Sequence, residues 1–206
     1  MPPRVRTAPR KKPRQGRSVA TVDAILDATA RVLCKTGYDR ASTNRVALAA
    51  GVSVGSLYQY FPSKEALVAA LAERHMTQMT TIVRANLAEV AHAPIPVAVR
   101  SIITAMFEAH TLEPALHKVL IEQVPRIGRL ENLHKMESET QAMVAGLIEA
   151  RRSEIRPRAL PEVVAFMLAH TVESVTHAVV TEELDASRAA AVADELTDLV
   201  LHYLVG

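Results

Sequence analysis

The sequence has one cysteine, few aromatic residues and no long apolar run. Cys34 is the only cysteine among 206 residues. It can form neither an internal disulfide nor a cysteine-rich zinc site, so we expect a reducing, cytoplasmic location. No continuous apolar run reaches the roughly 18–20 residues that span a bilayer, and no apolar stretch with a cleavage site follows the basic N-terminus. We therefore expect neither a membrane partner nor a secretion signal.

The motifs of common enzyme classes are missing too. The chain has no Gly-rich phosphate-binding loop and no His-Glu-x-x-His zinc motif. Cys34 is expected near the buried face of a helix, where an inert thiol is more common than a nucleophile or a redox sensor. These absences predict a protein that is not an enzyme and that has no cofactor.

What the chain does contain is a gradient of charge. Residues 1–17 contain seven basic side chains and no acidic one, whereas residues 92–206 have a net charge of −6. A protein with a positive front end and a negative rear end would be oriented by a polyanion such as DNA. We interpret residues 1–17 as a disordered basic arm. It is either a solvated leader or an arm that adds phosphate and minor-groove contacts.

After the arm, apolar residues recur at helical spacing. The first helix has its apolar side at intervals of three and four residues: Val22, Ile25, Leu26, Thr29, Val32 and Leu33. Gly37 is expected to end this helix, because glycine tolerates the left-handed backbone of a helix C-terminus. The sequence has no alternating strand pattern with hairpin turns. We therefore predict an all-α fold of about nine helices.

Two short helices are predicted next, with Gly51 between them. Ser42 or Thr43 caps the first helix, and Ser53 caps the second, which reaches about Phe61. Two short helices joined by a tight turn have the geometry of a helix-turn-helix, whose second helix enters the major groove of DNA.

A long helix follows, with Ser63 as its N-cap and an end near Val90. Turn residues and prolines at 91–96 then break the pattern. Five further helical segments are predicted: 97–110, 113–123, 127–151, 160–182 and 187–205. Beyond the arm, we therefore divide the chain into a helix-turn-helix domain at 18–65 and a helical regulatory and dimerisation domain at 66–206.

The second short helix has an unusual composition for a surface element. Val54, Gly55 and Ser56 are small and would let the backbone approach base edges. Gln59 could read an adenine through its amide group. The helix contains no arginine, so we expect apolar contacts and DNA shape to carry part of the specificity.

Two tyrosines flank Gln59. Tyr58 and Tyr60 offer hydroxyl groups to phosphates and ring faces to thymine methyl groups. Lys64, at the start of the next helix, can neutralise a phosphate together with the N-terminus of that helix. Phe61 is instead expected to pack in the core.

The run from Thr43 to Leu67 resembles the DNA-binding head of the tetracycline-repressor (TetR) family. The shared pattern is a helix that ends in Ala-Gly-Val-Ser, then Gly-Ser-Leu-Tyr-x-Tyr-Phe, then Ser-Lys-Glu-x-Leu, with Val46 where isoleucine is common. The resemblance implies a ligand-responsive transcriptional repressor that a small molecule releases from its operator. It also places the DNA-binding residues: Thr43, Asn44, Val54, Gly55, Ser56, Tyr58, Gln59, Tyr60 and Lys64.

The same resemblance implies a homodimer, because one head reads little DNA whereas two heads read half-sites about 34 Å apart. In this family the last two helices of each subunit form a four-helix bundle with those of the partner. Small and apolar residues recur along the side of both helices that would form this interface: Val163, Met167, Thr171, Ser174, Ala178, Val192, Leu196, Leu199 and Tyr203. The alternative is that these stripes pack inside the subunit.

The resemblance further implies a ligand cavity among the helices between residues 75 and 180. The candidate wall residues are Met106, Phe107, His110, Leu120, Met143, Leu147, Phe166 and His170. Taken singly, each is more often an ordinary core residue. Only three of the seven aromatic residues, Phe107, Phe166 and Tyr203, fall in the helical domain at 66–206, so an aromatic cage for a planar cation fits poorly. Aliphatic walls favour a flexible effector that is apolar or mildly polar.

Three other interpretations stay open. The same head would serve an activator, and the basic arm would also suit a non-specific architectural DNA-binding protein. On one helix His170, Glu173 and His177 are spaced like metal ligands, with His110 or His117 as a further donor. Histidines at helical spacing are common by chance, so we expect no metal site.

Overall fold

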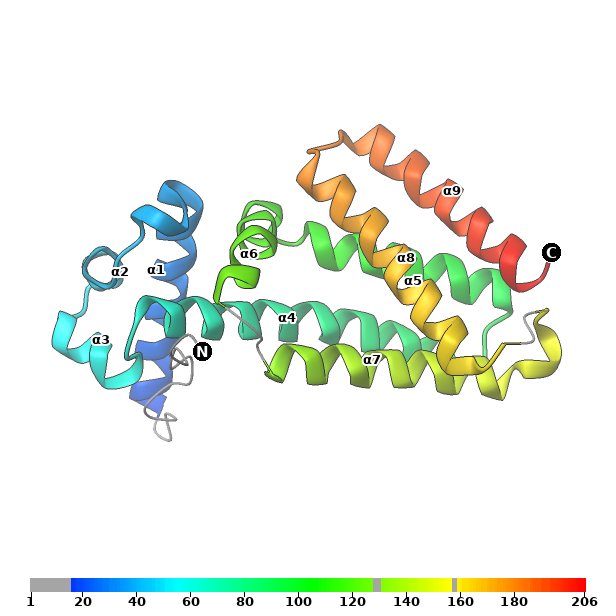
Figure 1. Cartoon of the computed structure of the whole chain (residues 1–206), viewed down its shortest axis with the longest axis horizontal. Helices are drawn as coiled ribbons and strands as arrows, with labels where there is room; N and C mark the ends of the chain where they lie inside the picture. The colour runs from blue at the N-terminus through cyan, green and yellow to red at the C-terminus, as the bar shows by residue number, and fades with distance from the viewer. Residues whose placement is uncertain (1–15, 128–130, 157–158) are drawn as a thin grey trace. The chain divides into compact units, whose positions relative to one another are not determined.

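The computed structural model describes residues 16–127, 131–156 and 159–206, and these residues form nine α-helices and one short 3₁₀ helix, with no strand among them (Figure 1). The prediction of an all-α fold is thereby confirmed. Residues 1–15 of the predicted basic arm lie outside the described residues, and helix α1 begins at Gly16.

The chain divides into two compact units. The first comprises the described residues of Met1–His75 together with Ala115–Glu131, and the second comprises Met76–Pro114 and Asn132–Gly206. Helix α4 (Lys64–Glu89) contributes residues to both units. The functional division between residues 65 and 66 stays a prediction.

In the first unit, α1 (Gly16–Arg40), α2 (Thr43–Ala50) and α3 (Val54–Tyr60) share a small apolar core with the start of α4. The largest side chains in this core are almost completely buried: Ile25, Leu33, Leu57, Phe61 and Leu67. Burial of one such side chain contributes about 1.5–3 kcal/mol. A few residues can therefore hold these short helices together. Helix α6 (Pro114–Ile127) also belongs almost entirely to this unit.

Two glycines mark turns of the first unit. Gly37 has a φ of 70° and a ψ of 170°, and it interrupts α1, which continues to Arg40. Gly51 has a φ of 68° and a ψ of 26°, the left-handed conformation that ends α2. A residue with a Cβ would be strained at either position, because positive φ brings the Cβ close to the backbone.

Serine hydroxyl groups cap the three helices that follow α1. The side chains of Ser42, Ser53 and Ser63 accept hydrogen bonds from the backbone N–H three residues later, at 3.3, 3.0 and 3.2 Å. Each bond satisfies a backbone donor that has no partner within the helix. The capping prediction is therefore confirmed, with Ser42 rather than Thr43 as the cap of α2.

The second unit contains, besides the end of α4, the following helices: α5 (Ile95–Thr111), α7 (Glu131–Ala150), the 3₁₀ helix η1 (Arg152–Glu154), α8 (Pro161–Thr181) and α9 (Ala186–Leu204). Helix α5 packs against both α8 and α9, which run in opposite directions after a short turn (Figure 1). Most core residues of this unit are aliphatic, and they include Val99, Ile103, Ile148, Val164, Val172, Val179, Leu196 and Val200.

Two expectations about individual segments are wrong. Helix α6 continues to Ile127 although the predicted segment ended at 123. The proline that suggested the earlier end lies in the last turn, where few intrahelical bonds follow it. Cys34 is exposed, because the preceding Leu33 is the residue that points into the core.

Among the described residues, helix α8 is long and apolar enough, by length and composition alone, to cross a membrane. A window of 18 residues in this helix has a mean hydropathy of 1.5, and 33% of the window is buried inside the protein. Polar residues interrupt the apolar run of α8, but the mean hydropathy of the window stays as high as that of a membrane-spanning helix. Much of the apolar surface of α8 is thus uncovered in the single chain.

Candidate functional site

Helices α2 and α3 are locked together at the turn that Gly51 forms. Val46 and Ala47 of α2 and Leu57 of α3 are at most 2% exposed. The N–H of Val52 donates to the carbonyl oxygen of Ala47 at 3.0 Å. With one side of each helix fixed in the core, the opposite side of α3 faces outwards on a rigid support.

The exposed side of α3 carries four of the residues predicted to bind DNA. Val54 and Tyr58 are 38% and 40% exposed, and Gly55 and Gln59 are also exposed. Their spacing of one, four and five residues places them on one face of the helix. Asn44, in the first turn of α2, is exposed as well. These residues form a surface that a base edge can reach.

Ser56 and Tyr60 are placed differently, because both are half-buried. The hydroxyl oxygen of Ser56 lies 2.8 Å from that of Ser53, and its N–H donates to the same Ser53 oxygen. Ser56 therefore stabilises the N-terminus of α3, whatever contact it makes with DNA.

A hydrogen bond joins the two helices on their outer side. The hydroxyl groups of Thr43 and Tyr58 lie 3.1 Å apart. This bond fixes the ring of Tyr58 and presents two hydroxyl groups side by side. One of the two O–H groups is used in this bond, so the bonded pair has one hydroxyl hydrogen left to donate to a phosphate oxygen.

Lys64 is held against Tyr38 of α1. Its Nζ donates to the carbonyl oxygen of Tyr38 at 2.9 Å and lies 4.0 Å from the centre of the tyrosine ring. The Tyr38 hydroxyl donates to Oε1 of Glu65 at 3.3 Å. Burial of Glu65 acts to raise its pKa, but hydrogen bonds from its own backbone, Ser63 and Tyr38, with the charge of Lys64, hold the pKa below its ordinary value.

Two arginines of this region were not predicted from the sequence. Arg45 is exposed next to Asn44, and its guanidinium donates to the carbonyl oxygen of Arg40 at 3.1 Å. Arg31 donates to the carbonyl oxygen of Ala49 at 3.2 Å. The position of Arg45 in the first turn of α2 is a signal that the sequence itself contains. The contact of Arg31 with α2 depends on tertiary structure and has no such signal.

On α8, the residues predicted for the dimer interface form an exposed stripe. Val163 and Met167 are 45% and 49% exposed, and Thr171, Ser174 and Ala178 are exposed too. A stripe of small and apolar side chains that is exposed on a single chain is typical of a surface that a partner covers.

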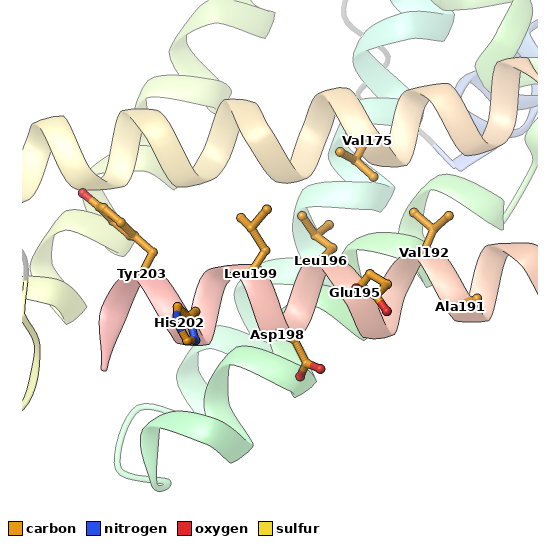
Figure 2. A pocket seen from close by; sticks show the side chains of 9 residues that line it. All are labelled: Val175, Ala191, Val192, Glu195, Leu196, Asp198, Leu199, His202 and Tyr203. Atoms are coloured by element: carbon orange, nitrogen blue, oxygen red, sulfur yellow. The ribbon is translucent and has the colours of Figure 1, made fainter. Parts of the chain in front are cut away.

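On α9, the predicted interface residues flank a shallow groove, and Figure 2 shows Val192, Leu199 and Tyr203 pointing towards the side on which α8 runs. Leu199 is 57% exposed, and Val192 and Tyr203 are half-buried. Leu196 is different, because it is 5% exposed and packs in the core of its own subunit. Only its edge can therefore contribute to an interface.

Five of the residues predicted to line a ligand cavity are inside the protein. Phe107 and His110 are buried in the second unit, and Met106 and Leu147 are half-buried there. Leu120 is buried but belongs to the first unit. The structure thus groups four of these side chains in one unit.

The other three predicted wall residues are not in the interior. Met143, Phe166 and His170 are exposed in the single chain. The rings of Phe166 and His170 meet edge to face, with their centroids 4.3 Å apart. The part of α8 that bears them therefore faces away from the core of its subunit.

Two family models match the chain. The model described as "Bacterial regulatory proteins, tetR family" matches residues 25–71, and the model described as "Tetracyclin repressor-like, C-terminal domain" matches residues 94–204, which is more than half of the chain. The chain belongs to the tetracycline-repressor family. The resemblance of the run 43–67 is thereby confirmed, and this TetR-family protein is a DNA-binding transcriptional regulator.

Among named proteins, the TetR-family chain is similar to the nucleoid occlusion factor SlmA of Haemophilus ducreyi. The two are 34% identical over 84 residues, which is 41% of each chain. It is also 53% identical over 49 residues to the HTH-type transcriptional repressor KstR of Rhodococcus jostii, which is 23% of each chain. The chain thus matches less than half the length of either relative.

The whole fold is similar to that of solved transcriptional regulators. The transcriptional regulator FadR of Bacillus subtilis, solved in complex with stearoyl-CoA, superposes with a TM-score of 0.70 over 86% of this chain and 96% of that one. The sequence identity is 19%, so the likeness concerns the fold.

Proposed function

We propose that this TetR-family regulator is a homodimeric repressor that binds an operator through α2 and α3 and releases it when a small molecule binds in the second unit. The observation that carries the proposal is the exposed side of α3. There Val54, Gly55, Tyr58 and Gln59 share one face of a helix whose other face is fixed in the core.

In the proposed complex, α3 lies in the major groove. The small Val54 and Gly55 let the backbone approach the base edges, and Gln59 pairs with an adenine through its amide. The polar ends of Asn44 and Ser56 reach bases or backbone beside it. The absence of an arginine from α3 leaves a share of the specificity to DNA shape.

The phosphate contacts would come from the rim of this surface. The paired hydroxyl groups of Thr43 and Tyr58 would bind one phosphate, and Tyr60 and Lys64 would bind another. We add Arg45, which is exposed beside Asn44, as a further phosphate contact. Each neutralised phosphate releases counterions, so operator affinity should fall steeply as the salt concentration rises.

The proposed dimer would bury the stripe of α8 and the groove of α9 in a four-helix bundle. The support is an apolar window of 18 residues in α8, of which 33% is buried in the single chain. Leu199 of α9 and Met167 of α8 would contact the partner, because each is about half exposed. Two heads would then read half-sites about 34 Å apart.

We propose a flexible effector with an aliphatic chain. The interior of the second unit contains mostly aliphatic side chains. They include a second cluster of buried residues: Met79, Val83, Leu87 and Ala109. The similar fold of Bacillus subtilis FadR, solved with stearoyl-CoA, supports an acyl compound as the first probe. As a regulator that binds operator DNA, this TetR-family protein would act in the cytoplasm. We assign it no enzyme activity.

Release would occur by a population shift. Helix α4 begins at Lys64 in the first unit and ends in the second, so it is one continuous element that both sites can bias. An effector that prefers one conformation of this helix would lower operator affinity by a coupling free energy of about 1–3 kcal/mol.

The proposal is tested by selecting bound duplexes from a random pool with the full-length chain. We expect a two-fold symmetric motif with half-sites about one helical turn apart. Gln59→Ala should relax the preference at one base pair of each half-site, because a bidentate contact is worth about 1–3 kcal/mol. Gln141→Ala on α7 is the matched control and should select the parent motif. A pool in which no motif is enriched would overturn the proposal.

A further inference from the structure

Tyr38, in the last turn of α1, contacts Lys64, the first residue of α4. The Nζ of Lys64 lies 4.0 Å from the centre of the tyrosine ring and donates to the tyrosine carbonyl oxygen at 2.9 Å. One lysine thus receives two contacts from one residue, an aromatic face and a carbonyl oxygen. Both residues belong to the first unit, so the contact is internal to the DNA-binding head.

Tyr38 is itself held at both ends. Its carbonyl oxygen also accepts from the N–H of Ala41 at 3.2 Å, and Ala41 is buried. Its hydroxyl group donates to Oε1 of Glu65 at 3.3 Å. These bonds leave the ring little freedom to turn away from Lys64. The lysine in return satisfies a carbonyl oxygen at the end of α1, a role that basic side chains often have at helix C-termini.

Glu65, the neighbour of Lys64, is held by other donors. Burial acts to raise the pKa of Glu65, but hydrogen bonds from its own backbone, Ser63 and Tyr38, with the charge of Lys64, keep that pKa low. The carboxylate is therefore ionised and bonded at the N-terminus of α4, where a negative charge is favourable. Tyr38 thus contacts both charged side chains and sets the position of the ammonium group.

The contact with Tyr38 leaves the Lys64 ammonium group able to bind an anion. An ammonium group has three N–H donors. In Lys64 one of them is used by the Tyr38 carbonyl oxygen, and the ring attracts the positive charge through its face. Lys64 is only half-buried, so a remaining donor can reach a phosphate oxygen. A side chain that is already fixed loses less conformational entropy on binding than a free one.

We propose that Tyr38 is a positioning residue for DNA binding, whose ring and carbonyl group fix the Lys64 ammonium so that it meets a backbone phosphate without further ordering. The proposal rests on the phosphate contact of Lys64 in the proposed function. Tyr38 itself needs no contact with DNA, so its effect should vanish when Lys64 is absent. The opposite arrangement, in which the ring withholds the ammonium from DNA, predicts tighter binding when the ring is removed.

The test is a double-mutant cycle on DNA affinity, measured by fluorescence anisotropy over a range of salt concentrations. It uses the full-length chain with a selected operator and with a scrambled duplex of the same length, because phosphate contacts do not depend on sequence. Lys64→Ala should lower the salt slope of a dimer by about 2, since each lost phosphate contact contributes about 0.9.

Tyr38→Leu should weaken binding by about 2- to 30-fold, the range that corresponds to a cation–π contact. In the Lys64→Ala background the same substitution should have almost no effect. Tyr38→Phe keeps the ring and the carbonyl group and should bind like the parent. Ile25→Val, a fully buried change in the same helix, is the control for a purely structural effect. Whatever it costs should be equal with and without Lys64.

A second measurement needs no variant of Tyr38 and decides the question if Tyr38→Leu prevents folding. In the NMR spectrum of the parent protein without DNA, the ring current of Tyr38 should shift the ε-methylene proton signals of Lys64 upfield. The signals of the exposed Lys35, on α1, provide the unshifted reference.

Three results would overturn the role of Tyr38. They are DNA binding by Tyr38→Leu that is as tight as that of the parent or tighter, an equal loss with and without Lys64, and Lys64 signals that are not shifted. If Lys64→Ala itself keeps the affinity and the salt slope of the parent, the phosphate contact in the proposed function fails as well. The Lys64→Ala measurement therefore distinguishes the two failures.

Discussion

Replacing Gly55 by alanine separates the folding of α3 from its approach to DNA. A Cβ added at Gly55 meets one neighbour within 4 Å, the Oγ of Ser53 at 3.9 Å, which is an ordinary van der Waals contact. The methyl group therefore fits the DNA-free protein. Alanine in place of a helical glycine generally stabilises a fold by about 0.5–1 kcal/mol. We expect the variant to unfold at a slightly higher temperature than the parent.

On the operator the same methyl group would lie between α3 and the base edges. Loss of one good contact to a base pair costs about 1–3 kcal/mol. At 25 °C this corresponds to binding that is about 5- to 160-fold weaker. Stability and operator affinity should thus change in opposite directions, which a general loss of structure cannot produce.

The assay is fluorescence anisotropy with a labelled operator at one salt concentration, beside a thermal melt of each protein. Gly146→Ala on α7 is the matched control, because a Cβ there has no neighbour within 4 Å and so fits the protein without strain. It should gain similar stability with unchanged operator affinity. If Gly55→Ala binds the operator as tightly as the parent, the backbone of α3 does not approach the bases and the reasoning fails.

Three further predictions concern the head, the interface and the second unit. Tyr58→Phe removes one of the two hydroxyl groups that meet at 3.1 Å. The free energy of operator binding should weaken by about 0.5–1.5 kcal/mol, and the melting temperature should not change. If the dissociation constant measured by anisotropy equals that of the parent, this phosphate contact is excluded. Leu199→Asp places a charge where the side chain is 57% exposed in the single chain, so analytical ultracentrifugation should detect folded monomers, and a persistent dimer would contradict the interface. Burial and Glu137 raise the pKa of Glu173, so its contribution to stability is present at acidic pH and is lost as the pH rises through its folded pKa. Glu173→Gln should therefore raise the melting temperature at neutral pH and leave it unchanged at acidic pH, whereas equal melting temperatures at neutral pH would argue against a buried carboxylate.

Local chemistry made the DNA-binding head predictable. Ser42 and Ser53 cap helices that begin one residue later, and Gly51 adopts the left-handed conformation that a short turn requires. These features depend on residues within four positions of one another, so the sequence alone contains the physical cause. Phe61, a large apolar side chain that is expected to pack in the core, is indeed 1% exposed.

Contacts between distant residues could not be predicted in the same way. The Nζ of Lys64 donates to Tyr38, which is 26 positions away, and no local pattern relates them. The sequence therefore predicts only a phosphate contact for Lys64, whereas the structure shows that this lysine also ties α4 to α1.

The orientation of α8 was equally hidden in the sequence. The helix is apolar around much of its circumference, so periodicity does not tell which face meets the core and which meets a partner. Phe166 and His170 were consequently expected in a cavity, whereas the structure exposes them. The meeting of His110 with His177, on helices far apart in the chain, likewise depends on packing.

The central claim is that the exposed side of α3 reads a specific operator. The most direct measurement is the ratio of the dissociation constants for a selected operator and for a scrambled duplex of the same length, at one salt concentration. We predict a ratio of at least about 10³ in favour of the operator. A ratio near one would contradict the claim, since it would describe a protein that binds DNA through charge alone.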